Sequence, residues 1–107
     1  MTGYASVLDA LGDGTRRRIV EGLRHGPLAV GEIARPLPVS RPAVSRHLRV
    51  LEAAGLVNHQ VVGTRHLYRL DERGLDELRR WVDGLWVTAL DRFAAHVTPT
   101  EEPDRRA

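Results

Sequence analysis

The spacing of apolar residues predicts three short helices in the first third of the chain. Each apolar set recurs every three or four residues and is followed by a glycine or a proline, which commonly end helices. The sets are Val7, Leu8 and Leu11 before Gly12, then Ile19, Val20 and Leu23 before Gly26-Pro27, then Ile33 and Ala34 within 30–35, before Pro36. Thr15 precedes the second set, and its hydroxyl can accept a hydrogen bond from a free backbone N–H, so we expect it to be the N-cap there.

A longer fourth helix is predicted from Ser40 to Leu51. Ser40 is a favourable N-cap, and Pro42 is tolerated in the first turn because the N–H that it lacks would have no partner there. The apolar stripe expected to face the core comprises Val44, Leu48 and Leu51. Gly55 then fits the position just past a helix end, where a left-handed backbone is common.

The pattern changes to a two-residue alternation between Val57 and Leu70. Two alternating runs flank Gly63-Thr64, a combination typical of a β-hairpin. Two short helices joined by a tight turn, followed by a hairpin, form the arrangement of a winged helix-turn-helix. The sequence therefore predicts a mainly helical fold with one small β-hairpin.

One long helix is predicted after the hairpin. Asp71 is its expected cap, and its apolar residues continue to about His96. We expect residues 1–97 to form a single winged helix-turn-helix domain for DNA binding and dimerisation. Residues 98–107 hold two prolines and five charged residues with nothing to bury, and we expect a disordered tail there.

Charge is distributed unevenly along the chain. The 107 residues carry a net charge of +2, but residues 14–70 carry +7, whereas residues 1–13 carry −2 and residues 71–107 carry −3. All sixteen basic residues are arginine, whose planar fork of donors suits phosphates and guanine edges. The basic middle of the chain therefore predicts a face that binds a polyanion.

The outer face of the fourth helix is the candidate DNA-binding surface. At 100° per residue its short and arginine side chains point away from the apolar stripe, so the backbone can approach base edges and the arginines can donate to bases and phosphates. The alternative is a solvated charged face, or a solvated loop arginine at the hairpin tip. The candidate residues are Ser40, Arg41, Pro42, Ser45, Arg46 and Arg49, together with Arg65 at the hairpin tip.

Two further groups of residues bear on this surface. The run Arg16-Arg17-Arg18 either meets phosphates or pairs with Asp13 and Glu21, and the sequence does not separate these alternatives. Tyr68 shares a strand face with Leu70, so we expect it in the core rather than as a stacking platform.

Apolar residues of the last helix span an arc of about 180°, whereas packing on one small core needs a stripe only somewhat wider than about 100°. Trp86, Leu90 and Phe93 belong to the excess and would form an exposed patch on a monomer. A two-fold dimer would cover this patch and would present two recognition helices to successive major grooves, about 34 Å apart. A wholly intramolecular core and a ligand pocket between subunits are the alternatives.

Taken together, several segments resemble the ArsR (arsenic-repressor-like) family of bacterial winged-helix regulators over about residues 5–97. The segments are Leu11–Ile19, Gly31–Ala34, Ser40–Leu48, Leu51–Val57, Gly63–Arg65 and Tyr68–Leu70. The resemblance implies a homodimer built from the first and last helices, with Ser40–Leu51 as recognition helix and Val57–Leu70 as wing. It also implies binding to an imperfect palindrome in double-stranded DNA and repression, often of the family member's own operon. The expected dimerisation residues are Val7, Leu8, Trp86, Leu90, Phe93 and Val97.

Members of this family that sense metals use cysteines near the helix matching residues 30–35, or Asp, His and Glu pairs on the last helix. This chain has no cysteine, and its last helix has Asp83, Asp91 and His96 without that pairing. A zinc site needs about four well-placed donors. We therefore expect no metal site and no cofactor, and the sequence identifies no effector.

Other classes of function have little support in the sequence. Ser45 and His47 are two residues apart on a helix and diverge, and no glycine-rich phosphate loop follows a strand, so we expect no enzyme. No apolar run is long enough to span a membrane, and a cytoplasmic protein is expected. The alternatives to a DNA-binding regulator are a winged-helix module that binds proteins and a repressor that responds to a metal or a small molecule.

Overall fold

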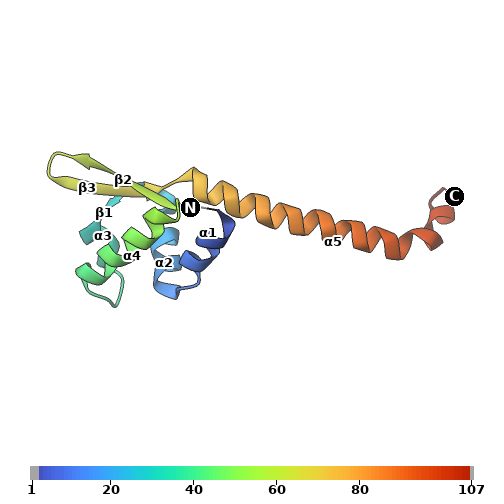
Figure 1. The fold of residues 1–107 in the computed structure, drawn as a ribbon, viewed down its shortest axis with the longest axis horizontal. Coiled ribbons are helices and arrows are strands. Elements are labelled where there is room, and N and C mark those ends of the chain that lie inside the picture. Colours follow the sequence, from blue (N-terminus) through green and yellow to red (C-terminus); the bar gives the residue numbers. More distant parts are fainter. Residues whose placement is uncertain (1–2, 107) are drawn as a thin grey trace.

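The computed structural model describes the backbone of residues 3–106 and the side chains of residues 3–96. Helices α1 to α4 form a compact body with a small antiparallel sheet, the hairpin projects from one side, and α5 extends away on the other (Figure 1). The longest dimension is 68 Å, against 28 and 25 Å across. The elements are α1 (Tyr4–Leu11), α2 (Gly14–Gly22), the 3-10 turn η1 (Leu23–His25), β1 (Leu28–Ala29), α3 (Val30–Ala34), α4 (Arg41–Ala53), β2 (Val57–Val62), β3 (Arg65–Leu70) and α5 (Glu72–Arg106).

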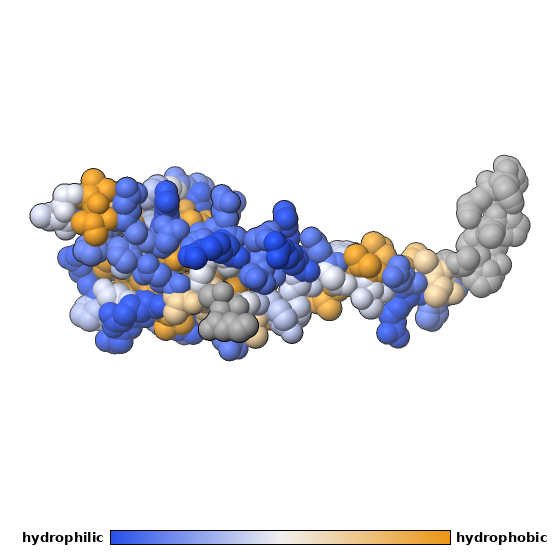
Figure 2. Space-filling view, turned by 45° about the horizontal axis from the view of Figure 1, so that its top comes forward, coloured by the Kyte–Doolittle hydropathy of each residue, from blue (hydrophilic) through white to orange (hydrophobic). Residues whose placement is uncertain are grey.

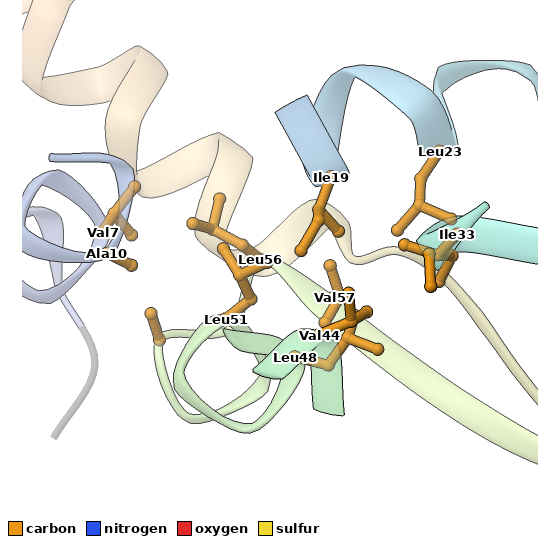
Figure 3. Close-up of a cluster of buried hydrophobic side chains, with 12 residues drawn as sticks. Val7, Ala10, Ile19, Leu23, Ile33, Val44, Leu48, Leu51, Leu56 and Val57 are labelled. Atoms are coloured by element: carbon orange, nitrogen blue, oxygen red, sulfur yellow. The ribbon is translucent and has the colours of Figure 1, made fainter. Parts of the chain in front are cut away.

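The core of the body is built around the inner face of α4. The predicted stripe of Val44, Leu48 and Leu51 is fully buried, which confirms the orientation expected for this helix. Figure 3 shows apolar side chains from α1, α2, α3 and β2 converging on the same cluster. Because these contacts bury one face of α4, its opposite face is presented to solvent in a fixed orientation.

The start of α2 differs from the prediction. Asp13, not Thr15, is the N-cap, and its Oδ2 accepts a hydrogen bond from the backbone N–H of Arg16 at 3.0 Å. This hydrogen bond holds the pKa of the Asp13 carboxyl below its usual value. A carboxylate interacts favourably with the positive end of the helix dipole, and Gly14 can follow it as the first helical residue. Ser40 is the N-cap of α4, as predicted.

The hairpin is part of a three-stranded antiparallel sheet in the order β1-β3-β2. Strands β2 and β3 pair from Val57 opposite Leu70 to Val62 opposite Arg65, which confirms the predicted hairpin. The sequence did not predict β1, because two residues show no alternation. β1 pairs with Tyr68 and Leu67, and this pairing ties the base of the wing to the segment that leads into α3.

Two glycines with positive φ permit the reversals on each side of β2. Gly55 has φ 78° just past α4, as predicted, and Gly63 has φ 66° in the hairpin turn. Residues that carry a side chain rarely adopt this left-handed backbone conformation. The backbone of Gly55 also lies against α5, where its carbonyl accepts a hydrogen bond from Gly74 N–H at 2.8 Å. A Cβ on Gly74 would lie only 2.5 Å from that oxygen, so this close approach requires glycine.

The last helix begins as predicted and ends later. Asp71 accepts a hydrogen bond from Arg73 N–H at 3.0 Å and precedes the first residue of α5. The predicted end at about His96 is wrong, because the backbone continues in helical geometry to Arg106. A proline costs a helix one hydrogen bond, but its φ is compatible with helical geometry. Side chains from residue 97 onward lie outside the described part, so the disordered tail and its boundary stay predictions. No described helix is long and apolar enough to cross a membrane.

Candidate nucleic-acid interface

The outer face of α4 exposes the residues predicted for DNA binding. Arg41, Pro42, Arg46 and Arg49 are exposed, and Ser45 is partly buried. The only acidic residue of α4, Glu52, lies near its end. The exposed face of the helix is therefore positively charged over its first two and a half turns.

Ser40 caps α4 and is also accessible to solvent. Its Oγ accepts the backbone N–H of Ala43 at 3.3 Å, which caps the helix, and the residue is exposed. The hydroxyl hydrogen can still donate to a phosphate. The structure therefore brings Ser40 to the start of the same face as Arg41 and Pro42.

A groove of about 670 Å³ runs between α3, the start of α4 and the wing. It brings three predicted residues together, Arg41, Ser45 and Arg65, although Arg65 is 20 positions beyond Ser45 in the chain. It also includes residues that the sequence did not predict for DNA binding, because only the fold places them beside α4. Those with polar side chains are Arg35, Thr64, His66 and Glu32.

Two arginines of this groove are held against α3. The guanidinium of Arg41 lies over Gly31, where an added Cβ would approach its nearest nitrogen to 3.4 Å. The guanidinium of Arg65 donates to Glu32 Oε1 at 3.1 Å. Arg65 was predicted as a DNA contact at the hairpin tip, with a solvated loop arginine as the alternative. The structure places it in an ion pair across the groove, and its contact with DNA stays a prediction.

The tip of the wing is apolar and well exposed. Val61 and Val62 lie at the end of β2 and are 57% and 50% exposed. Figure 2 shows hydrophilic residues over most of the visible face of the body and an apolar patch at the end of the hairpin. The wing therefore projects beyond the core and has side chains free to contact a ligand.

The alternatives left open for the arginine run at the start of α2 are partly resolved. Arg16 turns inward, where its Nε donates to Ala10 O at 2.6 Å and its Nη1 lies 3.3 Å from His47 Nδ1. Arg17 donates to Leu11 O at 2.8 Å. Both thus make contacts within the chain, and neither pairs with Glu21 in a contact that the structure shows. Arg18 is exposed.

The contact of Arg16 with α4 was not predicted. His47 on α4 lies 3.9 Å from the Asp13 carboxylate, so the cap of α2 and the inner edge of α4 meet at one polar cluster. No sequence signal indicates this cluster, because 31 positions separate Arg16 from His47. The cluster fixes α4 against α2 through polar contacts in addition to the apolar core.

A second polar cluster lies where α4 meets the wing. Glu52 lies 2.9 Å from His59 Nδ1, and the His59 ring lies 5.0 Å from that of Tyr68 and 5.3 Å from that of His66. Tyr68 packs against the core, as predicted, and burial raises the pKa of its phenol. The Glu52 carboxylate is therefore directed at a histidine of the wing rather than at the outer face of α4.

The apolar face of α5 is exposed beyond the body. Trp86 is 60% exposed, Leu90 57% and Phe93 67%, which agrees with the predicted excess of apolar surface. Near the body, the Trp81 ring stacks on Tyr4 of α1 at 5.6 Å.

The expected contribution of α1 to a dimer needs correction. Val7 is completely buried inside its own chain, because it faces the core of the body, and it has no surface to offer a partner. Leu8 is partly buried and keeps some exposed surface. The side chain of Val97 lies outside the described residues.

Metal-ligating residues do not cluster within the part of the chain whose side chains are described. No group of three or more histidine, aspartate or glutamate side chains there is arranged to hold a metal ion. Asp83, Asp91 and His96 are spread along exposed α5.

These features define a winged helix-turn-helix domain with a basic recognition helix. Residues 11–60 match the family model described as a helix-turn-helix domain. The HTH-type transcriptional regulator Rv2034 of Mycobacterium tuberculosis is 61% identical over 85 residues, which cover 79% of each chain. The transcriptional repressor SdpR of Bacillus subtilis is 31% identical over 77 residues, 72% of this chain and 86% of SdpR.

Solved structures agree with these relatives. An ArsR-like transcriptional regulator from Rhodococcus sp. RHA1 has a TM-score of 0.76 and 34% identity, and the match covers 92% of this chain and 93% of the other. The homodimeric winged helix-turn-helix DNA-binding domain Mb0332 from Mycobacterium bovis has a TM-score of 0.61 and 30% identity. The match covers 87% of this chain and 83% of that domain. The chain belongs to the ArsR family of transcriptional regulators. It is a DNA-binding regulator of transcription and not an enzyme.

Proposed function

We propose that the protein is a homodimeric repressor that binds an imperfect palindrome in double-stranded DNA and represses its own operon. The observation that carries this proposal is the exposed arginine face of α4, which has no acidic residue among its outward positions. SdpR, a relative, is named as a transcriptional repressor, and the domain from M. bovis is described as homodimeric.

Recognition is assigned to α4 in the major groove. Arg46 and Arg49 lie one turn apart on its outer face and can donate two hydrogen bonds each to guanine edges, or pair with phosphates. Pro42 and Ser45 are short and let the helix axis approach the bases. Ser40 donates its hydroxyl to a phosphate at the start of the helix.

The wing is assigned to the adjacent minor groove or the sugar–phosphate backbone. Arg65 and Thr64 of the hairpin turn line the same groove as Arg41 and Ser45 at the start of α4. Contacts of this kind hold the protein in register, whereas those in the major groove read sequence. Loss of a wing contact therefore lowers affinity for all duplexes.

Dimerisation is assigned to α5. The apolar side chains of Trp86, Leu90 and Phe93 gain the most from burial, since each is more than half exposed in the single chain. A two-fold axis would bring this face against its own copy, with Leu8 and Val97 at the margin. The two copies of α4 would then address half-sites one helical turn apart, about 34 Å.

The experiment is a mobility-shift titration on the DNA upstream of the gene, at several salt concentrations. With six to ten phosphate contacts, affinity falls by about 10³ to 10⁵ between about 50 and 200 mM salt. Equal binding to every duplex, or an affinity that does not change with salt, contradicts the proposal.

Arg46→Ala tests the assignment of the reading face. We expect it to lose about 1–3 kcal/mol of discrimination at particular base pairs of the operator. The control is Arg80→Ala, which removes the same charge from α5, where Arg80 pairs with Asp76 at 2.8 Å. A sequence preference that Arg46→Ala leaves unchanged shows that the assignment is wrong.

A further inference from the structure

One ion pair crosses the groove between the wing and α3, and it involves an arginine assigned to DNA. Arg65 Nη2 lies 3.1 Å from Glu32 Oε1. The Arg65 side chain is 57% exposed and that of Glu32 40% exposed, so both are accessible to a DNA phosphate. Arg65 is therefore already occupied by an anion in the protein without DNA.

The position of Glu32 is fixed by its own backbone. The same Oε1 accepts the N–H of Ala29 at 2.8 Å, at the start of α3. This is the reciprocal half of a capping arrangement, in which the third residue of a helix bonds back to the N-cap. The carboxylate is thus held at the groove and does not turn away when an anion approaches.

The surroundings of Glu32 are otherwise basic. Among the described residues that line this groove, Glu32 is the only acid, and the arginines there are Arg35, Arg41 and Arg65. A carboxylate within such a group repels phosphate and occupies one donor that phosphate would use. Its capping bond requires only an acceptor oxygen, which an uncharged amide also supplies.

We propose that Glu32 competes with DNA phosphate for Arg65, so that DNA binding transfers Arg65 from the carboxylate to the sugar–phosphate backbone. This inference rests on the proposed function. Glu32 then sets the affinity of the regulator without contacting a base, and it does so equally for every sequence, because a phosphate contact carries no sequence information. Exposed ion pairs are weak, so the effect of one pair on affinity is at most about five-fold.

Glu32→Gln is the first variant, because glutamine keeps the acceptor for Ala29 N–H and removes the charge. In a titration of the operator duplex we expect it to bind two- to five-fold more tightly than the wild type. The slope of log affinity against log salt should stay close to that of the wild type, since Arg65 contacts the same phosphate in both complexes. Glu21→Gln removes the same charge from an exposed position on α2 and is the matched control, with affinity close to that of the wild type.

Arg65→Ala supplies the second half of a double-mutant cycle. Alone it weakens binding and makes the salt slope shallower. In the Arg65→Ala background, Glu32→Gln has no further effect if the two residues act through each other. Tightening by the same factor in both backgrounds would show a general charge effect and would overturn the proposal.

Glu32→Asp separates pairing from net charge. It keeps the negative charge but withdraws the carboxylate by one methylene, so we expect part of the tightening seen with glutamine. Weaker binding of Glu32→Gln or Glu32→Asp, with melting temperatures unchanged, would mean that Glu32 positions Arg65 for DNA and would overturn the competition. A wild type that binds no duplex rejects the proposed function itself, which is a different outcome.

Discussion

The body of the molecule and the projecting part of α5 differ in how far their apolar side chains are buried. In the body, twelve hydrophobic side chains are buried by the chain itself, and Leu48 and Leu51 have no exposed surface. On α5 between Val82 and Phe93, the large apolar side chains are exposed. The same driving force that closes the body within one chain therefore favours association through α5 between two chains.

The two regions also differ in charge. Residues 14–70 carry +7 and residues 71–107 carry −3. DNA attracts the basic body and repels the acidic helix, which favours a complex in which α4 and the wing face the duplex and α5 lies away from it. The proposed division of the chain into a part that reads DNA and a part that joins two copies is thus supported by both hydrophobicity and charge.

The largest effect is expected in the apolar core of the body, behind α4. Leu48→Ala leaves a cavity behind α4 and should lower the free energy of unfolding by about 2–5 kcal/mol, measured by denaturant titration. Val50→Ala, on the same helix but 42% exposed, is the control and should change it by less than about 0.5 kcal/mol. Equal losses in the two variants would show that α4 is not anchored by its inner stripe.

The next effect is expected on α5. Leu90→Glu places a charge in the proposed dimer interface and should raise the dimer dissociation constant by about 100-fold or more, measured by sedimentation. Thr88→Glu, two residues earlier and about 160° around the helix, is the control and should leave the dimer intact. A dimer that tolerates Leu90→Glu does not form through this face.

Local sequence signals were sufficient for most of the fold. The stripe on α4, the Ser40 cap, Gly55 and the alternation around Gly63 each act within a few residues, and the structure confirms them. The predicted N-cap of α2, Thr15, was wrong because Asp13, two residues earlier, also carries a side chain that can cap a helix, and it is Asp13 that does so. The strand β1 was missed because its pairing with β3 is its only signal.

The electrostatic contacts of the site depend on the fold and could not be predicted from the sequence. The outward positions of Arg46 and Arg49 follow from helical periodicity, since one helix determines them. The pairing of Arg65 with Glu32 joins residues 33 positions apart, and that of Arg16 with His47 joins residues 31 apart. Composition identifies a basic region, but only the tertiary structure shows which arginines already have partners.

The smallest effect is expected at the junction between the two regions, where Asp71 begins α5. This carboxyl is buried, and the hydrogen bond from the Arg73 side chain, 2.7 Å from Nη2 to Oδ2, holds its pKa well below the usual value. Asp71→Asn should therefore lower the free energy of unfolding by about 1 kcal/mol at neutral pH.

The pH dependence of this loss has a definite sign. Because the folded pKa is lowered, the contribution of Asp71 is fully present above the unfolded pKa of about 3.9 and is lost as the pH falls through the folded value. The difference between wild type and Asp71→Asn should thus be constant near neutral pH and shrink below about pH 4, measured by urea titration. Asp83→Asn, at an exposed position on α5, is the control. A difference that stays constant into acid would show that the charge of Asp71 does not anchor α5 to the body.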